Sequence, residues 1–313
     1  MSGAFFIFEL MAKQYKDPGF GAKYGKRTKR IINKDGSFNI KRVGAASGVQ
    51  DLYKTLVTVS WPKFLLGILA IYILVNLVFA SIYFCLGTAA LSGLENDNVL
   101  HHFLHCFYFS CQTFTTVGYG AIAPVSATAS VASSIEALMG LLAFALATGL
   151  VYGRFSKANS KIKFSSFATI CPYQDITSLQ FRIINQRTNV LMEMEAEVTI
   201  SIQAGNGDYT RTYHKLTLER DKIVFFPLSW TIVHPINTDS PLYGLTVQDL
   251  IDRDAEVFML IKGFDDTFGQ SVHTRHSYIS SEIKATNGFE RIFKTTEEGD
   301  ILINVNDLDK VKA

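Results

Sequence analysis

Two long apolar stretches stand out in the first half of the chain. Residues 64–86 contain no charged side chain over 23 positions, which is long enough for a helix to cross the hydrocarbon core of a bilayer. Residues 127–153 are rich in Ala, Ser and Gly, which let membrane helices pack closely. Their one charged residue is Glu136, and an ionisable group inside a span is a functional candidate. We predict two transmembrane helices, with Glu136 facing either a central cavity or the back of the segment between them.

The segment between the two predicted spans has a different pattern. Residues 99–112 are aromatic and half polar and make about four helical turns, too few to cross a bilayer. A short helix followed by a Gly-containing loop between two spans is typical of a re-entrant pore helix. The C-terminal end of such a helix carries partial negative charge, so it would favour a cation in the cavity beneath the loop.

The loop after this segment contains the sequence Thr-Val-Gly-Tyr-Gly, which indicates a potassium selectivity filter. In such a filter, backbone carbonyls of four identical loops replace the water shell of the ion. Gly118 and Gly120 can adopt the required backbone angles cheaply, and Thr116 can add its hydroxyl oxygen at the inner end. Val117 and Tyr119 would then point away from the axis and pack the filter wall. The alternative is an ordinary Gly-containing turn, which the two flanking spans disfavour.

From about residue 163 onward the pattern changes to that of β-strands. Between residues 192 and 203, starting at Met192, apolar and polar side chains alternate with a two-residue period. Residues 205–208 predict a turn, and residues 210–220 predict the returning strand. Further strands are expected at 164–171, 179–185, 222–230, 255–263, 270–280 and 289–295, and one short helix at 246–253 with Thr246 as its N-cap. Many short strands at regular spacing favour an antiparallel β-sandwich.

Composition agrees with a chain that is part membrane-embedded and part soluble. The 313 residues are 48% hydrophobic, and the mean hydropathy is +0.17. We expect a basic, solvated cytoplasmic tail over residues 1–43, a transmembrane domain over 44–156, and a cytoplasmic β-sandwich domain over 157–313. Within the second domain, residues 47–60 predict a short amphipathic helix lying along the membrane interface before the first span.

The positions of the basic residues predict the orientation in the membrane. Lys and Arg are frequent before residue 64, absent from 64 to 153, and present again at Arg154, Lys157, Lys161 and Lys163. By the positive-inside rule both termini are cytoplasmic, in a multi-pass protein of the cell (inner) membrane whose filter mouth lies outside. The same four cations predict contact with anionic lipid. A topology signal without lipid binding is an equal alternative.

Other function classes find little support in the sequence. His214, His234, His273 and His276 are the only candidates for catalysis in the predicted cytoplasmic domain, and they accompany no nucleophile motif and no metal-ligand spacing. We therefore predict no enzyme activity and no cofactor besides K⁺ ions in the filter. No basic and aromatic surface pattern favours nucleic acid. A membrane-anchored β-sandwich adaptor or enzyme is the alternative from another class.

Several motifs together resemble the inward-rectifier potassium channels, and most closely their prokaryotic (KirBac-type) branch. The resemblance covers about residues 30–300 and includes the filter sequence already described. The other motifs are Ser60-Trp61-Pro62, Gly153-Arg154-Phe155, Phe164-Ser165-Ser166 and Ser240-Pro241-Leu242-Tyr243-Gly244.

The resemblance implies a homotetramer with an immunoglobulin-like cytoplasmic sandwich and a gate at the crossing of the inner helices. Tyr152 matches the bulky residue that closes this crossing, and Gly140 and Gly149 match hinge positions of the inner helix. Residues near 47–60 match the slide helix of the family. Phosphoinositide-like anionic lipids inhibit prokaryotic members, which implies the same sign of regulation here. A channel gated by a small ligand in the β domain is a second possibility within the class.

Some positions depart from the pattern of the animal members. Phe144 occupies the place where strong rectifiers carry an acid that holds Mg²⁺ or polyamine blockers, so strong block in the cavity is not expected. Gln112 and Ile122 replace the ion pair that braces the filter, which makes Glu136 the nearest candidate for that support. Glu195 matches a cytoplasmic pore-lining acid, with a solvated strand face as the alternative. Ba²⁺ is a further blocker that the family implies.

Overall fold

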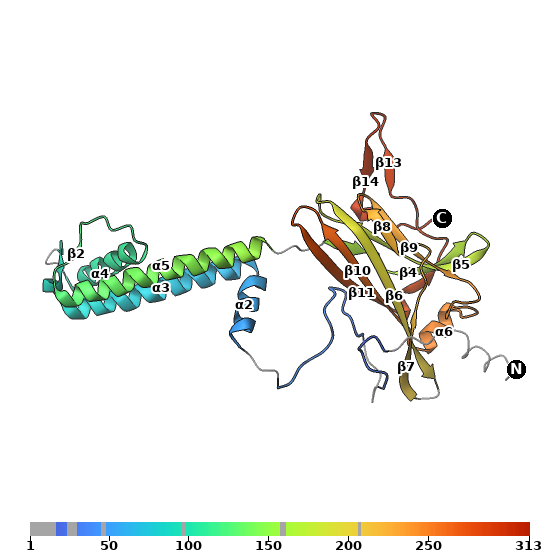
Figure 1. The fold of residues 1–313 in the computed structure, drawn as a ribbon, viewed down its shortest axis with the longest axis horizontal. Coiled ribbons are helices and arrows are strands. Elements are labelled where there is room, and N and C mark those ends of the chain that lie inside the picture. Colours follow the sequence, from blue (N-terminus) through green and yellow to red (C-terminus); the bar gives the residue numbers. More distant parts are fainter. Residues whose placement is uncertain (1–16, 24–29, 45–47, 95–97, 157–160, 206–207) are drawn as a thin grey trace. The chain divides into compact units, whose positions relative to one another are not determined.

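The computed structural model describes residues 17–23, 30–44, 48–94, 98–156, 161–205 and 208–313 (Figure 1). Its contacts divide the chain into two compact units. The helical unit comprises Gly44–Lys157. The β unit comprises Met1–Val43 together with Ala158–Ala313.

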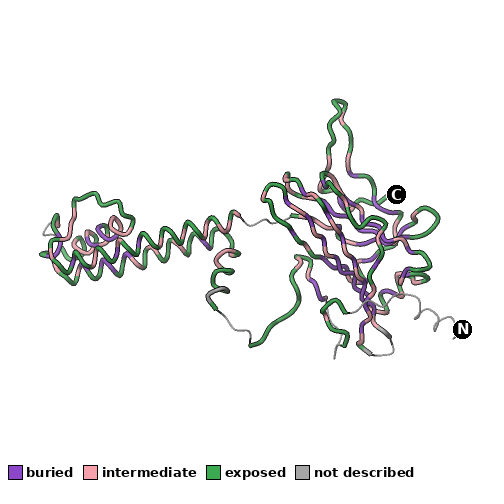
Figure 2. The backbone as a smooth tube through the Cα atoms, viewed as in Figure 1, coloured by how far each residue is buried: buried purple, intermediate pink, exposed green. Residues whose placement is uncertain are grey.

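The helical unit contains the two predicted spans and the short helix between them. Its helices are α2 (Val49–Thr58), α3 (Trp61–Leu86), α4 (Val99–Phe114) and α5 (Ala127–Phe155), with a 3₁₀ turn at Thr88–Ala90 and a short pair of strands, β1 (Leu91–Ser92) with β2 (Ala123–Pro124). Helices α3 and α5 are long and apolar enough to cross a membrane. Most of their side chains are exposed in the single chain (Figure 2), as expected for helices that face lipid or other subunits.

The helix boundaries follow local chemistry. Helix α3 starts after Ser60 with Pro62 in its first turn, and it ends at Gly87, whose φ of 81° a side chain would disfavour. Helix α4 is capped by Asn98, whose side chain accepts a hydrogen bond from the His101 amide at 3.0 Å. Helix α5 is capped by Ser126, whose hydroxyl accepts a hydrogen bond from the Ala129 amide at 3.1 Å.

The β unit is built from two five-stranded sheets. In the first sheet the order is β11-β10-β6-β7, and β8 also pairs with β6. In the second the order is β12-β4-β5-β3, and β9 pairs with β5. The strands of the first are β6 (Leu191–Gly205), β7 (Asp208–Lys215), β8 (Lys222–Phe225), β10 (Glu256–Asp265) and β11 (Gln270–Ile279). Those of the second are β3 (Ile162–Phe164), β4 (Ala168–Tyr173), β5 (Ile176–Asn185), β9 (Ser229–Ile236) and β12 (Ile283–Ala285).

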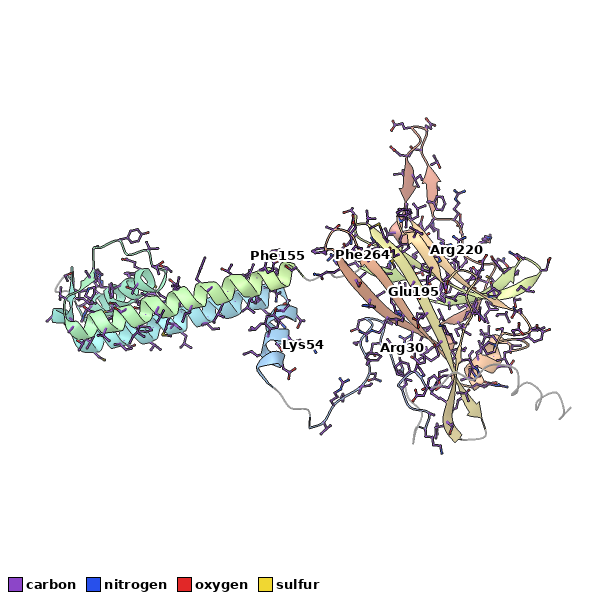
Figure 3. The ribbon with its side chains drawn as sticks, viewed as in Figure 1. Arg30, Lys54, Phe155, Glu195, Arg220 and Phe264 are labelled. Atoms are coloured by element: carbon purple, nitrogen blue, oxygen red, sulfur yellow. The ribbon has the colours of Figure 1, made fainter. Side chains whose placement is uncertain are left out.

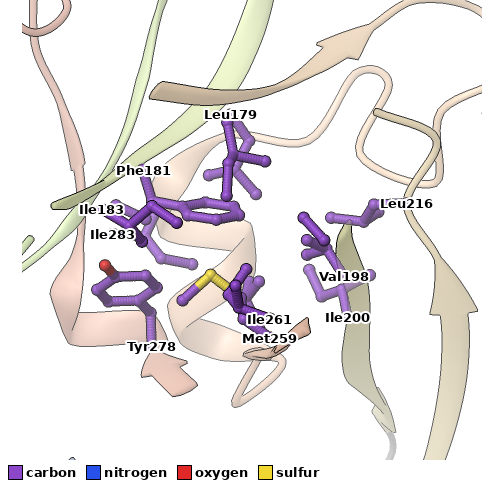
Figure 4. Packing of buried hydrophobic residues seen from close by; sticks show 14 of the residues in the cluster. Leu179, Phe181, Ile183, Val198, Ile200, Leu216, Met259, Ile261, Tyr278 and Ile283 are labelled. Carbon is purple, nitrogen blue, oxygen red and sulfur yellow. The ribbon is translucent and has the colours of Figure 1, made fainter. Parts of the chain in front are cut away.

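Apolar side chains of both sheets form one core (Figure 4). Phe181 of β5, Ile200 of β6 and Ile261 of β10 are completely buried in it. The predicted β-sandwich is therefore confirmed, and the predicted short helix is α6 (Val247–Asp252) with the Thr246 hydroxyl capping the amide of Asp249. A small hairpin, β13 (Phe293–Thr295) with β14 (Ile301–Ile303), lies outside the two sheets.

Several strand predictions need correction. The stretch 222–230 is not one strand, because β8 ends before Pro227 and β9 begins after it in the other sheet. One pair, β12 with β4, is parallel. The predicted alternation is wrong at Met192, because Glu193 has a φ of 49° and forms a β-bulge that turns Leu191 inward instead. The centre of the predicted turn at 205–208 lies outside the described residues.

The described part of the N-terminal segment packs on the β unit, which corrects the prediction of a solvated tail. Ile31 and Ile32 are buried against Tyr213 and Phe258. The Ile31 amide donates to the Glu256 carboxylate at 3.1 Å. These contacts join segments more than 180 positions apart, so no local pattern could have indicated them.

Candidate ion-conducting site

The loop after α4 has an unusual backbone in which positive φ angles recur at every second residue. Thr116, Gly118 and Gly120 have φ of 59°, 54° and 83°, whereas Val117 and Tyr119 between them do not. Alternation of this kind turns successive carbonyls toward one side of the chain, as a row of ion ligands requires. The conformation is strained for Thr116, since β-branched residues rarely adopt it, and strain of this kind is concentrated at functional sites.

The end of helix α4 anchors this loop. The Gln112 carbonyl accepts hydrogen bonds from the amides of Val117 at 2.9 Å and Gly118 at 3.3 Å. The Thr113 carbonyl accepts one from the Thr116 amide at 3.0 Å. Gln112, named in the predicted filter region, therefore holds this loop through its main chain.

The side chains of the loop have little cover in the single chain. Val117 is 54% exposed and Tyr119 is 79% exposed. Both were predicted to pack the wall of the filter. The described residues of one chain do not provide that wall.

A buried polar network lies behind the pore helix. Glu136 of α5 is completely buried. The Tyr83 hydroxyl of α3 donates to one carboxylate oxygen at 2.6 Å, and the Ser110 hydroxyl of α4 contacts the other. Asn76 of α3 lies beside them, with its Oδ1 3.0 Å from the Ser110 hydroxyl, and its amide donates to the Tyr72 carbonyl. Of the two predicted placements of Glu136, the structure has the one at the back of the pore helix.

The partners of Glu136 were not predicted from the sequence. Asn76 and Tyr83 are polar groups inside an otherwise apolar span, and such groups usually have a hydrogen-bonding partner. That signal could have indicated them as candidates. It could not have indicated that they join Ser110 and Glu136.

The two glycines predicted as hinges have different surroundings. A Cβ on Gly140 would lie 1.9 Å from the Phe114 carbonyl oxygen, so α5 and α4 approach each other closely here. Gly149 has nothing within 4 Å of such a Cβ. Helix α5 runs without interruption through both positions. Gly140 therefore has a packing role that the hinge prediction did not include, and the hinge role of both glycines stays a prediction.

Two side chains of α5 predicted to act in the pore are exposed in the single chain. Phe144 is 74% exposed and Tyr152 is 73% exposed. The described residues of the same chain leave both rings largely uncovered, so neither ring packs in a core of the single chain.

Comparison with known proteins decides the family. The ion channel family matches residues 68–157, and the family described as inward rectifier potassium channel C-terminal domain matches residues 162–313. The inward rectifier potassium channel Kirbac3.1 of Paramagnetospirillum magnetotacticum is 36% identical over 283 residues, which cover 89% of this chain and 94% of that protein. The chain belongs to the prokaryotic inward rectifier potassium channels.

The matching family consists of ion channels and not of enzymes, which agrees with the prediction of no enzyme activity.

Among solved structures, wild-type OgpA from Akkermansia muciniphila matches with a TM-score of 0.17 and 11% identity, covering 40% of this chain and 29% of that one. A score this low carries no argument about the fold of this channel.

The described cations predicted as a lipid site are divided between the two units of the channel. Arg154 lies in the helical unit, where its guanidinium donates to the carbonyls of Leu56 and Val59 at the end of α2. It also stacks on the rings of Trp61, at 4.6 Å, and Phe64, at 4.4 Å. Arg154 therefore has protein partners, and its lipid contact stays a prediction.

The other three predicted lipid cations differ in their placement. Lys157 lies outside the described residues. Lys161 is exposed and precedes β3, whereas Lys163 is half-buried within β3. Lys161 and Lys163 both belong to the β unit.

Glu195, predicted to line the cytoplasmic pore, lies on β6 (Figure 3). Its carboxylate is 3.4 Å from the Lys222 ammonium on β8, and its side chain is 34% exposed. Both predicted roles, a pore-lining acid and a solvated strand face, agree with this placement.

Replacing Gly140 by Ala should separate the inner helix from the pore helix. The added methyl group would occupy the place of the Phe114 carbonyl oxygen, so we expect a loss of about 1–3 kcal/mol in stability and a loss of K⁺ flux. Gly149→Ala is the matched control and should raise helix stability by up to about 1 kcal/mol. Thermal unfolding of the purified full chain measures both. Equal stability of the two variants would contradict the packing role of Gly140.

Replacing Glu136 by Ala should destabilise the helical unit. The hydroxyls of Tyr83 and Ser110 would lose their acceptor in an apolar interior, at a cost of about 1–3 kcal/mol each. Glu136→Gln keeps an oxygen acceptor and should cost less. Ser110→Ala can be compared with Ser134→Ala, which makes the same change outside the network. The network would be dispensable if Glu136→Ala matched Ser134→Ala in thermal stability and in the ratio of K⁺ to Na⁺ flux.

Proposed function

We propose that four copies of the chain form a K⁺-selective pore in the cell membrane. The observation that carries this proposal is the alternation of positive φ at Thr116, Gly118 and Gly120. A row of carbonyls from one loop covers one side of an ion, and four such rows around an axis replace its whole water shell. The exposed rings and methyl groups of the loop support the same conclusion, because neighbouring subunits would cover them.

Selection of K⁺ would come from the main chain of residues 116–119. Their carbonyl oxygens, with the Thr116 hydroxyl at the inner end, coordinate dehydrated K⁺. The anchoring of the loop to Gln112 supports this role, because it holds the row in place while ions enter and leave. The C-terminal end of α4 adds a partial negative charge near the cavity.

The orientation in the membrane follows from charge. Lys and Arg are absent from residue 64 to residue 153 and frequent on both sides of this range. The positive-inside rule then makes both termini cytoplasmic and places the filter mouth outside. The β units would surround a cytoplasmic continuation of the pore, with Glu195 among its lining residues.

Gating would take place at Tyr152, whose exposed ring closes the pore where the inner helices cross. Arg154, two positions further on, ties α5 to the carbonyl end of α2. A displacement of the slide helix α2 along the membrane surface would therefore pull on the gate. Phosphoinositide-like lipids would act on this coupling through Lys157 and Lys161, and Gly149 would allow the inner helix to bend.

Block of the pore would be weak from the inside. Phe144 offers no charge to Mg²⁺ or polyamines, which need an acid to be held in the cavity. Ba²⁺ has the size and charge to compete for carbonyl sites in the filter itself. Ba²⁺ is therefore the more informative blocker.

Liposomes that contain the purified chain should pass K⁺ in excess of Na⁺, and Ba²⁺ should stop the flux. Gly118→Ala forces a side chain into a φ of 54°, so we expect it to abolish K⁺ flux or its excess over Na⁺ flux. Gly67→Ala, on α3 with nothing within 4 Å, is the matched control and should conduct like the unmodified chain. Equal fluxes of K⁺ and Na⁺ through the unmodified chain would refute the filter.

Two substitutions of Arg154 separate mechanical coupling from lipid binding. Lysine keeps the charge but cannot donate from one planar fork to two carbonyls, so Arg154→Lys and Arg154→Gln should alter basal flux to a similar extent. Flux is measured in liposomes with increasing phosphoinositide. If Arg154→Lys behaved like the unmodified chain while Arg154→Gln lost lipid sensitivity, charge toward lipid and not the hydrogen-bonded coupling would be the role of this residue.

A further inference from the structure

The outer helix α3 and the pore helix α4 are joined by side-chain contacts that run in opposite directions along the two helices. The ring of Phe84 lies against that of His102, with centroids 5.0 Å apart. Asn76, about two turns earlier on α3, contacts Ser110, about two turns later on α4. The next turn of α3 in this direction therefore meets the last turn of α4, after which the filter loop begins.

Tyr72 is the residue of α3 at that level. Its ring packs edge-on against Phe114, the last residue of α4, with centroids 5.9 Å apart and planes at 65°. Its hydroxyl hydrogen-bonds to the side chain of Cys111. All three side chains are half-buried in the single chain. Lipid offers no partner to a hydroxyl inside a span, so the phenol group favours a position in which it holds Cys111.

The last turn of α4 is the anchor of the filter loop. The carbonyl of Cys111 accepts hydrogen bonds from the Thr115 amide at 3.1 Å and from the Thr115 hydroxyl at 2.7 Å. The following carbonyl accepts those from the amides of Val117 and Gly118. Tyr72 thus contacts the side chain of a residue whose main chain holds the start of the loop.

Helix α5 contacts the same turn through Gly140. The close approach of this glycine to the Phe114 carbonyl fixes the main chain of the residue whose ring Tyr72 covers. Asn76 adds a further restraint, because its amide donates to the Tyr72 carbonyl at 2.7 Å while its Oδ1 accepts from Ser110. A helix end that is held by two other helices can shift less than one held by a single neighbour.

We propose that Tyr72 is a positioning residue of the selectivity filter. Its ring holds Phe114 and its hydroxyl holds Cys111, and both contacts keep the carbonyls of the last helical turn in place for the amides of the loop. The inference rests on the proposed K⁺-selective function, because it assigns a support to that filter. Packing of the ring alone is the competing role, and phenylalanine would fill that role equally well.

Flux in liposomes and amide hydrogen exchange of the purified full chain separate the two roles. Tyr72→Phe keeps the ring and removes the hydroxyl. We expect the ratio of K⁺ to Na⁺ flux to fall by at least about threefold, and exchange of the amides of residues 115–118 to become faster by a similar factor, because one hydrogen bond is lost. Tyr209→Phe makes the same change at an exposed position of β7 and should leave both quantities unchanged.

Cys111 tests the other end of the contact. Cys111→Ser keeps a hydrogen-bonding group and should behave like the unmodified chain, whereas the apolar Cys111→Val should behave like Tyr72→Phe. The double variant with both Tyr72→Phe and Cys111→Val should resemble either single variant, since both remove the same contact. Cys85→Val changes an exposed cysteine of α3 and is the matched control, with no effect expected.

The two measurements distinguish a failure of this inference from a failure of the proposed function. Equal K⁺ and Na⁺ fluxes through the unmodified chain would refute the filter, while amide exchange would still report whether Tyr72 holds the loop. If Tyr72→Phe does not fold, Cys111→Ser and Cys111→Val give the same test. Unchanged exchange in Tyr72→Phe and Cys111→Val, or effects that add in the double variant, would overturn the inference.

Discussion

A carboxyl group buried among membrane helices must have partners for both oxygens, and this requirement organises the helical unit. Glu136 obtains them from Tyr83 on the outer helix and Ser110 on the pore helix. Leaving such a group unpaired away from water would cost several kcal/mol. The three helices therefore have one favourable arrangement in which the network closes. That arrangement positions α4, and the loop that contains residues 116–120 follows the end of this helix.

The filter loop in turn depends on the pore helix rather than on its own side chains. Its amides bind carbonyls of the last helical turn, and its carbonyls are left for another partner. Carbonyls without a partner are unfavourable at membrane depth unless they line a cavity that holds ions or water. The same constraint explains why the loop tolerates a strained Thr116. The animal-type ion pair is absent at Gln112 and Ile122, and the buried network of Glu136 lies behind the same helix.

Two contacts extend this arrangement along α5. Gly140 lets the inner helix touch the carbonyl end of the pore helix, and Arg154 joins the same inner helix to the end of α2. A guanidinium suits the second contact, because its planar fork serves two carbonyls while its faces stack on aromatic rings. Both contacts lie on one helix. Helix α5 thus contacts both the end of α4 and the end of α2.

The sequence by itself determined the features that depend on short-range patterns. Uninterrupted apolar runs identified α3 and α5, and alternation identified most strands, because each of these depends on neighbours within a few turns or residues. The Thr-Val-Gly-Tyr-Gly run predicted the filter from its own five residues. Only the tertiary structure decided the partners of Glu136, the role of Gly140, the docking of Ile31 and the inward turn of Leu191 at the bulge. Each of these depends on which distant segments meet, and hydrophobic periodicity gives the face that is buried but not the residue that covers it.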